Sequence, residues 1–88
     1  MRLESKTFKK DIREFIVYDG NNADKVVEFT NMKIFKILSD GTLMLNCDNK
    51  ESFQKLRIHQ YDYVTIDTTG DVHVLSANDT HNLFKIVQ

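Results

Sequence analysis

The sequence contains three histidines and one cysteine, side chains that commonly bind metals or act as nucleophiles. His59, His73 and His81 fall in different predicted elements, and no pair has the spacing of metal ligands. Cys47 has no second cysteine to form a CxxC pair. It continues the strand alternation of the leucines before it, which predicts a buried, unreactive thiol. We therefore expect no metal, no cofactor and no cysteine-based catalysis.

The glycines and acidic residues also give no sign of an active site. Gly20, Gly41 and Gly70 are isolated from one another, so the chain has no glycine-rich phosphate loop. The acidic residues fall in turns and at predicted helix starts, where capping and the helix dipole explain them. The prediction is a protein that is not an enzyme and has no small-molecule substrate.

The basic residues offer a different chemistry, the binding of phosphate groups. They gather before or within the first strand, on the arm of a hairpin, and on a segment predicted to be helical. If these places converge in the fold, they could follow the backbone of DNA or RNA. The candidate nucleic-acid-binding residues are Lys6, Lys9, Lys10, Arg13, Lys33, Lys36, Lys50, Lys55 and Arg57.

The overall charge favours a plainer interpretation, an ordinary solvated surface with charges of both signs. The net charge is −1, whereas a dedicated nucleic-acid binder usually has a clear positive excess. The charge is weakly polarised along the chain. Residues 1–36 hold eight Lys or Arg against six acids, and residues 37–88 hold four against seven.

Length and composition predict one small domain, residues 1–88, that is 41% hydrophobic and 28% charged. The sequence has no apolar run long enough to span a membrane, and its first residues do not resemble a signal peptide. A single cysteine fits a reducing compartment, so we expect a cytoplasmic protein with no membrane partner.

The second half of the chain contains an internal repeat at an interval of about 29 residues. The segment "FKILSDGTLMLNCDNKESFQKL" aligns with "VTIDTTGDVHVLSANDTHNLFKI", with one residue of slip near the end. Each copy begins with a predicted hairpin, turning at Gly41 or Gly70, where glycine accepts a positive φ angle. Because Thr69 is β-branched, we expect a three-residue loop at the second turn, with Gly70 in the left-handed position.

Each hairpin is predicted to run into a short helix. In the first copy Asp48 or Asn49 caps a helix that carries Phe53 and Leu56 and ends near His59. In the second copy Ser76 and Asp79 have the same capping spacing, with Asn78 as the rival cap. Its predicted apolar stripe is Leu83, Ile86 and Val87. The predicted core residues are Leu45, Val74, Phe53 and Leu83.

A third hairpin is predicted to precede the repeat, with strands at Glu14–Tyr18 and Lys25–Thr30 around the turn "DGNNAD". Residues 1–12 either extend the first strand or form a short helical lead-in. The predicted fold class is α+β: antiparallel β-hairpins with two short helices and an internal strand–turn–strand–helix repeat.

Four stretches resemble one known family: "FIVYDGNNADKVVEFTN", "KIFKILSDGTLML", "ESFQKL" and "TTGDVHVLSANDTHNLFKIV". Their order is similar to that of the double-wing C-terminal DNA-binding domain of the MotA family, the middle-promoter transcription factors of T-even bacteriophages. The resemblance spans roughly residues 13–88 and implies hairpin wings flanking a groove that meets double-stranded DNA. We expect no activation through the N-terminal domain of that family, and the acidic second half departs from a DNA-binding surface.

Two functional hypotheses follow. The first is a small phage-type regulatory protein that binds DNA or RNA through a double-wing-like domain, for example to regulate transcription. The second is a phage inhibitor or antitoxin that binds and blocks a host enzyme or defence protein during host takeover. Either would act in the cytoplasm of the host bacterium. The basic first half favours nucleic acid, and the near-neutral net charge favours a protein partner.

Overall fold

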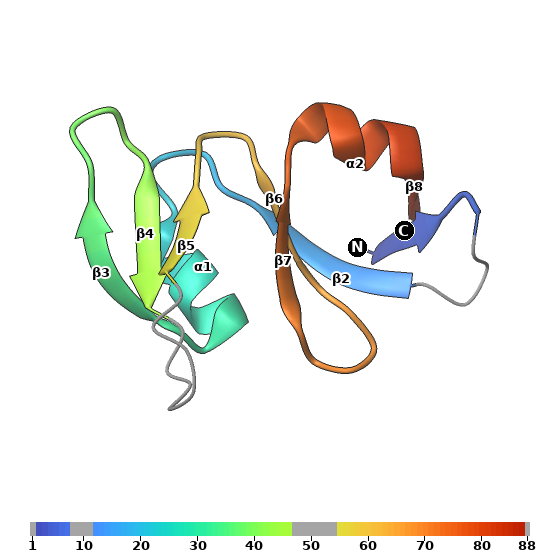
Figure 1. Ribbon diagram of the computed structural model, residues 1–88, viewed down its shortest axis with the longest axis horizontal. Helices are drawn as coiled ribbons and strands as arrows, with labels where there is room; N and C mark the ends of the chain where they lie inside the picture. Colours follow the sequence, from blue (N-terminus) through green and yellow to red (C-terminus); the bar gives the residue numbers. More distant parts are fainter. Residues whose placement is uncertain (1, 8–11, 47–54, 88) are drawn as a thin grey trace.

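The computed structural model describes residues 2–7, 12–46 and 55–87 of the chain. Within these ranges the fold is α+β, as predicted, with two antiparallel sheets and two short helices (Figure 1). The strands are β1 Arg2–Ser5, β2 Ile12–Val17, β3 Lys33–Ile37, β4 Leu43–Asn46, β5 Lys55–Ile58, β6 Tyr63–Ile66, β7 Val72–Leu75 and β8 Phe84–Val87; the helices are α1 Ala23–Thr30 and α2 Ala77–Leu83.

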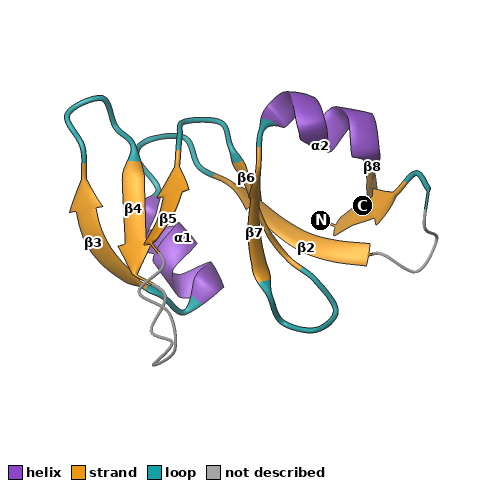
Figure 2. Cartoon of the chain, in the orientation of Figure 1, coloured by secondary structure: helices purple, strands orange, loops and turns teal. Residues whose placement is uncertain are grey.

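The two sheets lie at opposite ends of the molecule. One has five strands in the order β7-β6-β2-β1-β8, and the other has three in the order β3-β4-β5. Helix α1 lies beside the three-stranded sheet and α2 lies over the five-stranded sheet (Figure 2). Residues 1–12 were predicted either to extend the first strand or to form a helix. The described part instead contains a separate strand, β1, which pairs antiparallel with both β2 and β8.

The two repeated hairpins are confirmed, and they turn in the same way. In the first, Leu38 N–H donates to Thr42 O at 2.8 Å and Gly41 N–H donates to Leu38 O at 2.9 Å. In the second, the residues 29 positions later make the same two bonds, each 3.0 Å long. The φ angle is +90° at Gly41 and +91° at Gly70, as expected of a loop that needs a left-handed residue.

The predicted strand at Lys25–Thr30 is wrong, because this segment lies in helix α1. The helix buries Val26 and Thr30, which are four residues apart and therefore share one face. Thr30 Oγ1 donates to Val26 O at 2.8 Å, and Asn31 ends the helix in a left-handed conformation at φ 56°. The β-branched residues that indicated a strand instead cover the core from a helix.

The preceding turn over residues 19–24 was predicted only in part: Gly20 has φ +92°, but Ala23 and Asp24 already belong to α1. The predicted third hairpin does not form, because β2 pairs with β1 and β6 instead.

The helix predicted for the first copy is wrong over its second half. Residues Lys55–Ile58 form strand β5, which pairs with β4 so that Leu56 lies opposite Leu45. Leu56 packs against the core from a strand and not from a helix. The proposed caps Asp48 and Asn49, the core residue Phe53 and the cysteine Cys47 all lie outside the described residues.

The second helix is confirmed at its start and wrong at its end. Ser76 caps α2, because its Oγ accepts a 3.1 Å hydrogen bond from the Asp79 N–H. The helix stops at Leu83, which is 52% exposed and is not core. Beyond it the chain forms β8, where Phe84 is buried and the predicted stripe residues Ile86 and Val87 are exposed.

Two clusters of apolar residues form the core. The larger joins the two sheets and α1, and its fully buried members are Tyr18, Val26, Leu43, Leu45, Ile58 and Val64. The smaller lies between the five-stranded sheet and α2 and contains Leu3, Tyr63 and Phe84. Leu45 is thus core as predicted, whereas Val74 is partly buried and packs against the larger cluster.

Candidate nucleic-acid interface

The two faces of the three-stranded sheet differ in chemistry because side chains alternate between faces along a strand. Leu43 and Leu45 of β4 are fully buried on the inner face, and Ile58 of β5 lies opposite Leu43 and is also buried. Met44 and Asn46 occupy the alternate positions and are only half-buried. They therefore belong to an outer face that points away from the core.

Four exposed basic side chains lie on this outer face in two cross-strand rows. Residues directly opposite one another in paired strands point to the same side of a sheet. The first row is Lys33, Asn46 and Lys55, and the second row is Lys36, Met44 and Arg57. Neighbouring strands are about 4.8 Å apart, so the cations of each row are attached to backbones roughly 10 Å apart, on either side of β4.

A β-bulge in β3 places Phe35 on the same face. The register passes from the pair Ile34–Leu45 to the pair Lys36–Met44 and leaves Phe35 as an extra residue. The Nζ atom of Lys55, on the far side of β4, lies 3.6 Å from the centroid of the Phe35 ring, a cation–π contact. Phe35 is nonetheless 48% exposed. A regular strand would place Phe35 and Ile37 on one face, but the bulge puts them on opposite faces.

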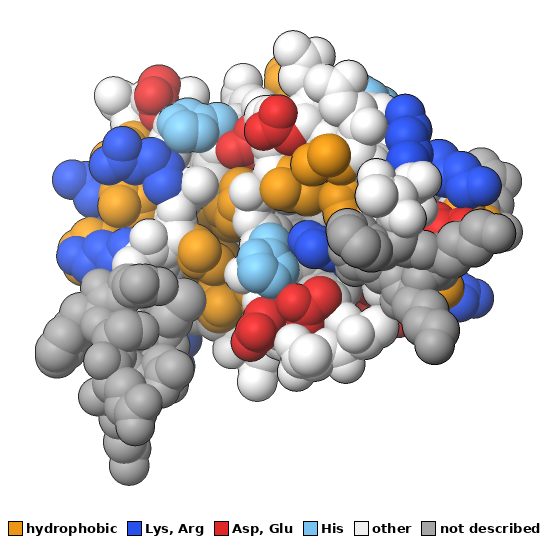
Figure 3. Space-filling view, turned by 45° about the vertical axis from the view of Figure 1, so that its right-hand side comes forward, with side chains coloured by type: hydrophobic (Ala, Val, Ile, Leu, Met, Phe, Trp, Pro, Cys, Tyr) orange, Lys and Arg blue, Asp and Glu red, His pale blue; other side chains and the backbone are white. Residues whose placement is uncertain are grey.

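We call this surface the basic face and define it as Lys33, Phe35, Lys36, Met44, Asn46, Lys55 and Arg57. The three strands that carry it contain no acidic residue. Figure 3 shows the basic side chains at this end of the molecule, with apolar atoms between them. Among the residues that the structure describes, the strands of this face thus carry one sign of charge, although the whole chain has a net charge of −1. A local field of this kind attracts anions whatever the total charge.

Two of the sequence-predicted basic residues lie elsewhere, on the five-stranded part of the fold. Lys6 follows β1, and its Nζ donates to His81 O at 2.7 Å. Arg13 lies on β2, with its guanidinium 4.9 Å from the centroid of the Phe84 ring, and it also donates to Thr65 Oγ1 at 3.5 Å. Both side chains have local partners on the α2 side of the sheet, so they do not join the basic face.

The structure therefore brings together four of the nine candidate residues, Lys33, Lys36, Lys55 and Arg57. Lys9, Lys10 and Lys50 lie outside the described residues. The three members of the basic face that sequence reasoning missed are Phe35, Met44 and Asn46. The irregular alternation of "KIFKI", with a lysine at both the first and the fourth position, was the only signal of the bulge.

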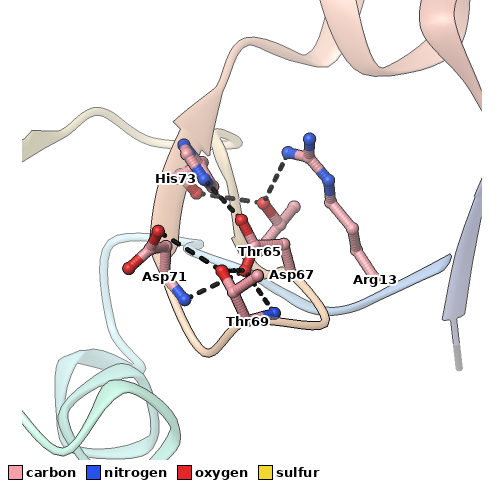
Figure 4. A network of polar contacts seen from close by, with 6 residues as sticks. All are labelled: Arg13, Thr65, Asp67, Thr69, Asp71 and His73. Carbon is pink, nitrogen blue, oxygen red and sulfur yellow. Dashed lines mark hydrogen bonds and ion pairs between the residues drawn. The ribbon is translucent and has the colours of Figure 1, made fainter. Parts of the chain in front are cut away.

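A separate polar network closes the β6–β7 hairpin (Figure 4). Asp67 Oδ1 accepts from the Thr69 hydroxyl at 2.6 Å, from Thr69 N–H at 2.9 Å and from Asp71 N–H at 3.0 Å. Its Oδ2 lies 3.0 Å from His73 Nε2. The Thr69 hydroxyl, followed by His73 and these backbone N–H groups, holds the pKa of Asp67 well below its usual range. This network stabilises the turn.

Two further groups have shifted pKa values, both close to the first repeated hairpin. Hydrogen bonds from Thr42 lower the pKa of Asp40 in the β3–β4 turn. Burial, followed by the nearby charge of Asp19, raises the pKa of Tyr18. The hydroxyl of Tyr18 donates to Gly41 O at 2.7 Å, so it is a structural hydrogen-bond donor at ordinary pH.

The five-stranded sheet has a shallow hollow with a volume of about 470 Å³, lined by residues of both charge signs. Arg2 lies there beside Glu14 and Asp67, with Ile12 and Ile66 as apolar neighbours. Such a mixture does not favour one sign of ligand charge. Among the described residues no group of three or more His, Cys, Asp or Glu could hold a metal ion. In the same ranges, no helix is long and apolar enough to cross a membrane.

The chain matches no protein-family model, no curated protein and no solved structure in our comparisons. The function of the chain is therefore inferred from the chemistry of its surfaces.

Proposed function

We propose that this protein is a non-enzymatic nucleic-acid-binding regulator that contacts DNA or RNA through the basic face. The observation that carries the proposal is the grouping of Lys33, Lys36, Lys55 and Arg57 on one sheet face, whose three strands contain no acidic residue. The resemblance to the phage double-wing domains points in the same direction and supports a role in phage transcription regulation in the host cytoplasm.

The arrangement suits a phosphate backbone for a physical reason. Each lysine or arginine that pairs with a phosphate releases condensed counterions, which favours binding through the entropy of the released ions. This entropy gain becomes smaller as the salt concentration rises, so the affinity falls. Four contacts predict that affinity falls about 50- to 150-fold between about 50 and 200 mM salt, the smaller figure applying to single strands. Arg57 can also hold a phosphate through two parallel hydrogen bonds, which lysine cannot do.

The direct test reverses charge within one row of the basic face. The variant Lys36→Glu/Arg57→Glu changes the face from four cations to two cations and two anions. We expect it to lose binding to mixed DNA and RNA in mobility-shift and anisotropy titrations. Both positions are exposed, so the thermal midpoint should change little. Retained binding by this variant would refute the proposed interface.

The matched control makes the same change in total charge away from the basic face. Lys25 is exposed on α1, and Lys85 is exposed on β8. Lys85 forms only a 3.8 Å surface ion pair with Glu4, which contributes little to stability. The variant Lys25→Glu/Lys85→Glu should therefore keep most of its binding at moderate salt. An equal loss in both variants would indicate a non-specific response to net charge.

One observation favours the second candidate function, binding and blocking a host protein as an inhibitor or antitoxin. Strand β3 is an edge of its sheet, and Ile34 and Ile37 on it are 45% and 51% exposed. Edge strands with exposed apolar side chains can pair with a strand of another protein. Under this alternative a host protein is captured from nuclease-treated lysate. The capture resists salt and is weakened by Ile34→Thr/Ile37→Thr.

A further inference from the structure

The position of Phe35 adds specificity to the proposed function, on which the following inference rests. An aromatic residue that is 48% exposed leaves a large apolar surface in water. Lys55 Nζ lies over one face of its ring, and Phe35 lies on the outer sheet face, which neither of the two described helices covers. A ligand that brings both negative charge and flat aromatic rings would satisfy both features together.

The basic face is also arranged for unpaired bases. Its cations stand on β3 and β5, and the central strand β4 contributes the neutral side chains Met44 and Asn46 between them. A chain of phosphates can follow a line of cations while its bases lie over the neutral side chains of β4. Asn46 provides both a hydrogen-bond donor and an acceptor for a base edge. In a duplex the base faces are stacked on one another, so the Phe35 ring could not reach them.

We propose that the basic face binds single-stranded nucleic acid, with an unpaired base stacked on the Phe35 ring and the phosphates paired with the surrounding lysines and Arg57. In the free protein the Lys55 ammonium occupies the centre of one ring face, 3.6 Å away. An incoming base takes the place of this ammonium or uses the other ring face. In either case Lys55 stays close enough to pair with a phosphate. Stacking of this kind tolerates any base, because every base has a π face.

The chain contains no tryptophan, which makes a clean fluorescence test possible. In Phe35→Trp the new indole is the only tryptophan and keeps an aromatic ring at the stacking position. We expect its emission to be quenched on titration with an unpaired twelve-nucleotide oligothymidine or oligouridine. Quenching by either oligonucleotide supports the proposal, and comparing the two separates DNA from RNA. The same length of perfectly paired duplex should quench much less.

A second tryptophan variant serves as the positional control. Ile37 is on the same strand and equally exposed, but it lies opposite buried Leu43 and belongs to the inner side. Ile37→Trp should therefore bind the oligonucleotide without quenching. Quenching of equal size in both variants would contradict stacking at Phe35.

The third variant, Phe35→Leu, keeps an apolar side chain but removes the ring. We expect single-strand affinity to fall about 5- to 150-fold, the range measured when a stacking aromatic is removed. If duplex binds as tightly as the single strand and Phe35→Leu has no effect, the single-strand inference is overturned while the proposed function stands. If neither ligand binds at low salt, the proposed function itself is wrong.

Discussion

The hydroxyl of Tyr18 donates a 2.7 Å hydrogen bond to the carbonyl oxygen of Gly41, which joins the end of β2 to the β3–β4 turn. Tyr18 is fully buried in the larger core cluster, so its ring and its hydroxyl both hold the three-stranded sheet against the rest of the fold. The basic face is carried by this sheet, and its orientation depends on that contact.

Replacing Tyr18 by phenylalanine should keep the packing and remove only this hydrogen bond. We expect the free energy of unfolding to fall by about 1 kcal/mol, the typical net value of a buried hydrogen bond. Urea denaturation followed by circular dichroism would measure the change. Tyr61→Phe is the control, because Tyr61 is 64% exposed and should show no change. Equal stabilities of Tyr18→Phe and the parent would mean that the bond contributes nothing.

The same tyrosine predicts a loss of stability at alkaline pH. Its pKa is raised above the ordinary value of 10.0, chiefly by burial, so the folded protein holds the proton more tightly than the unfolded chain. The free energy of unfolding should therefore decline as the pH rises beyond that ordinary value. Denaturation at a series of alkaline pH values would show this decline in the parent and a smaller one in Tyr18→Phe. Identical declines in the two proteins would exclude Tyr18 as its source.

Asp67 predicts the opposite behaviour at low pH. Its pKa is lowered in the folded state, first by the Thr69 hydroxyl, so the charged form stabilises the hairpin. This stabilisation is complete above the unfolded pKa near 3.8 and is lost as the pH falls through the lower folded value. Asp67→Asn should reduce the dependence of stability on pH in this acid range. An unchanged slope in Asp67→Asn would contradict the prediction.

Gly41 and Gly70 occupy equivalent positions in the two repeated hairpins, so alanine substitutions at both test whether the two turns have the same energetic requirement. Gly70 has φ +91° with no heavy atom within 4 Å of an added Cβ, whereas the same atom at Gly41 would lie 3.3 Å from Gln60 Nε2. Gly70→Ala should cost about 1 kcal/mol or somewhat more, from backbone strain alone. Gly41→Ala should cost at least as much, since Gln60 must also move. Thermal melts of the two variants would measure this order of stability. A lower melting temperature for Gly70→Ala than for Gly41→Ala would contradict the prediction.

The hairpins were predictable because the residues within each turn determine its conformation. A loop that needs a left-handed residue selects glycine, and neither Gly41 nor Gly70 depends on distant parts of the chain for that choice. The N-cap Ser76 is local in the same sense. These are the parts of the fold that sequence reasoning located correctly.

The segments "KVVEFT" and "KLRI" were not predictable on local grounds. Each is short and apolar enough to satisfy either a helical or a strand period. Tertiary contacts decide between them. A strand would place Glu28 on the same face as Val26 and Thr30, whereas the helix buries those two residues and leaves Glu28 exposed. In the second segment, Leu56 and Ile58 are two residues apart and share one face of the sheet because the segment is a strand.

The second of these errors also concealed the candidate site. On a helix, Lys55 and Arg57 would point in very different directions, because residues two apart do not share a helical face. On strand β5 they share the outer face, and β4 sets them opposite Asn46 and Met44. The bulge that turns Phe35 to the same side has no strong local signature. The charges were visible in the sequence, but their convergence is a property of the sheet.

The last prediction divides the basic residues by their contribution to salt dependence. Single alanine substitutions at Lys36, Lys55 and Arg57 should each reduce the slope of log affinity against log salt by about 0.7 on single strands. Lys6→Ala and Lys25→Ala should leave the slope unchanged, because Lys6 donates to His81 O beyond the five-stranded sheet and Lys25 lies on α1. Anisotropy titrations at four salt concentrations would measure each slope. A reduction at Lys6 as large as that at Arg57 would place phosphate contacts outside the basic face and enlarge the interface toward α2.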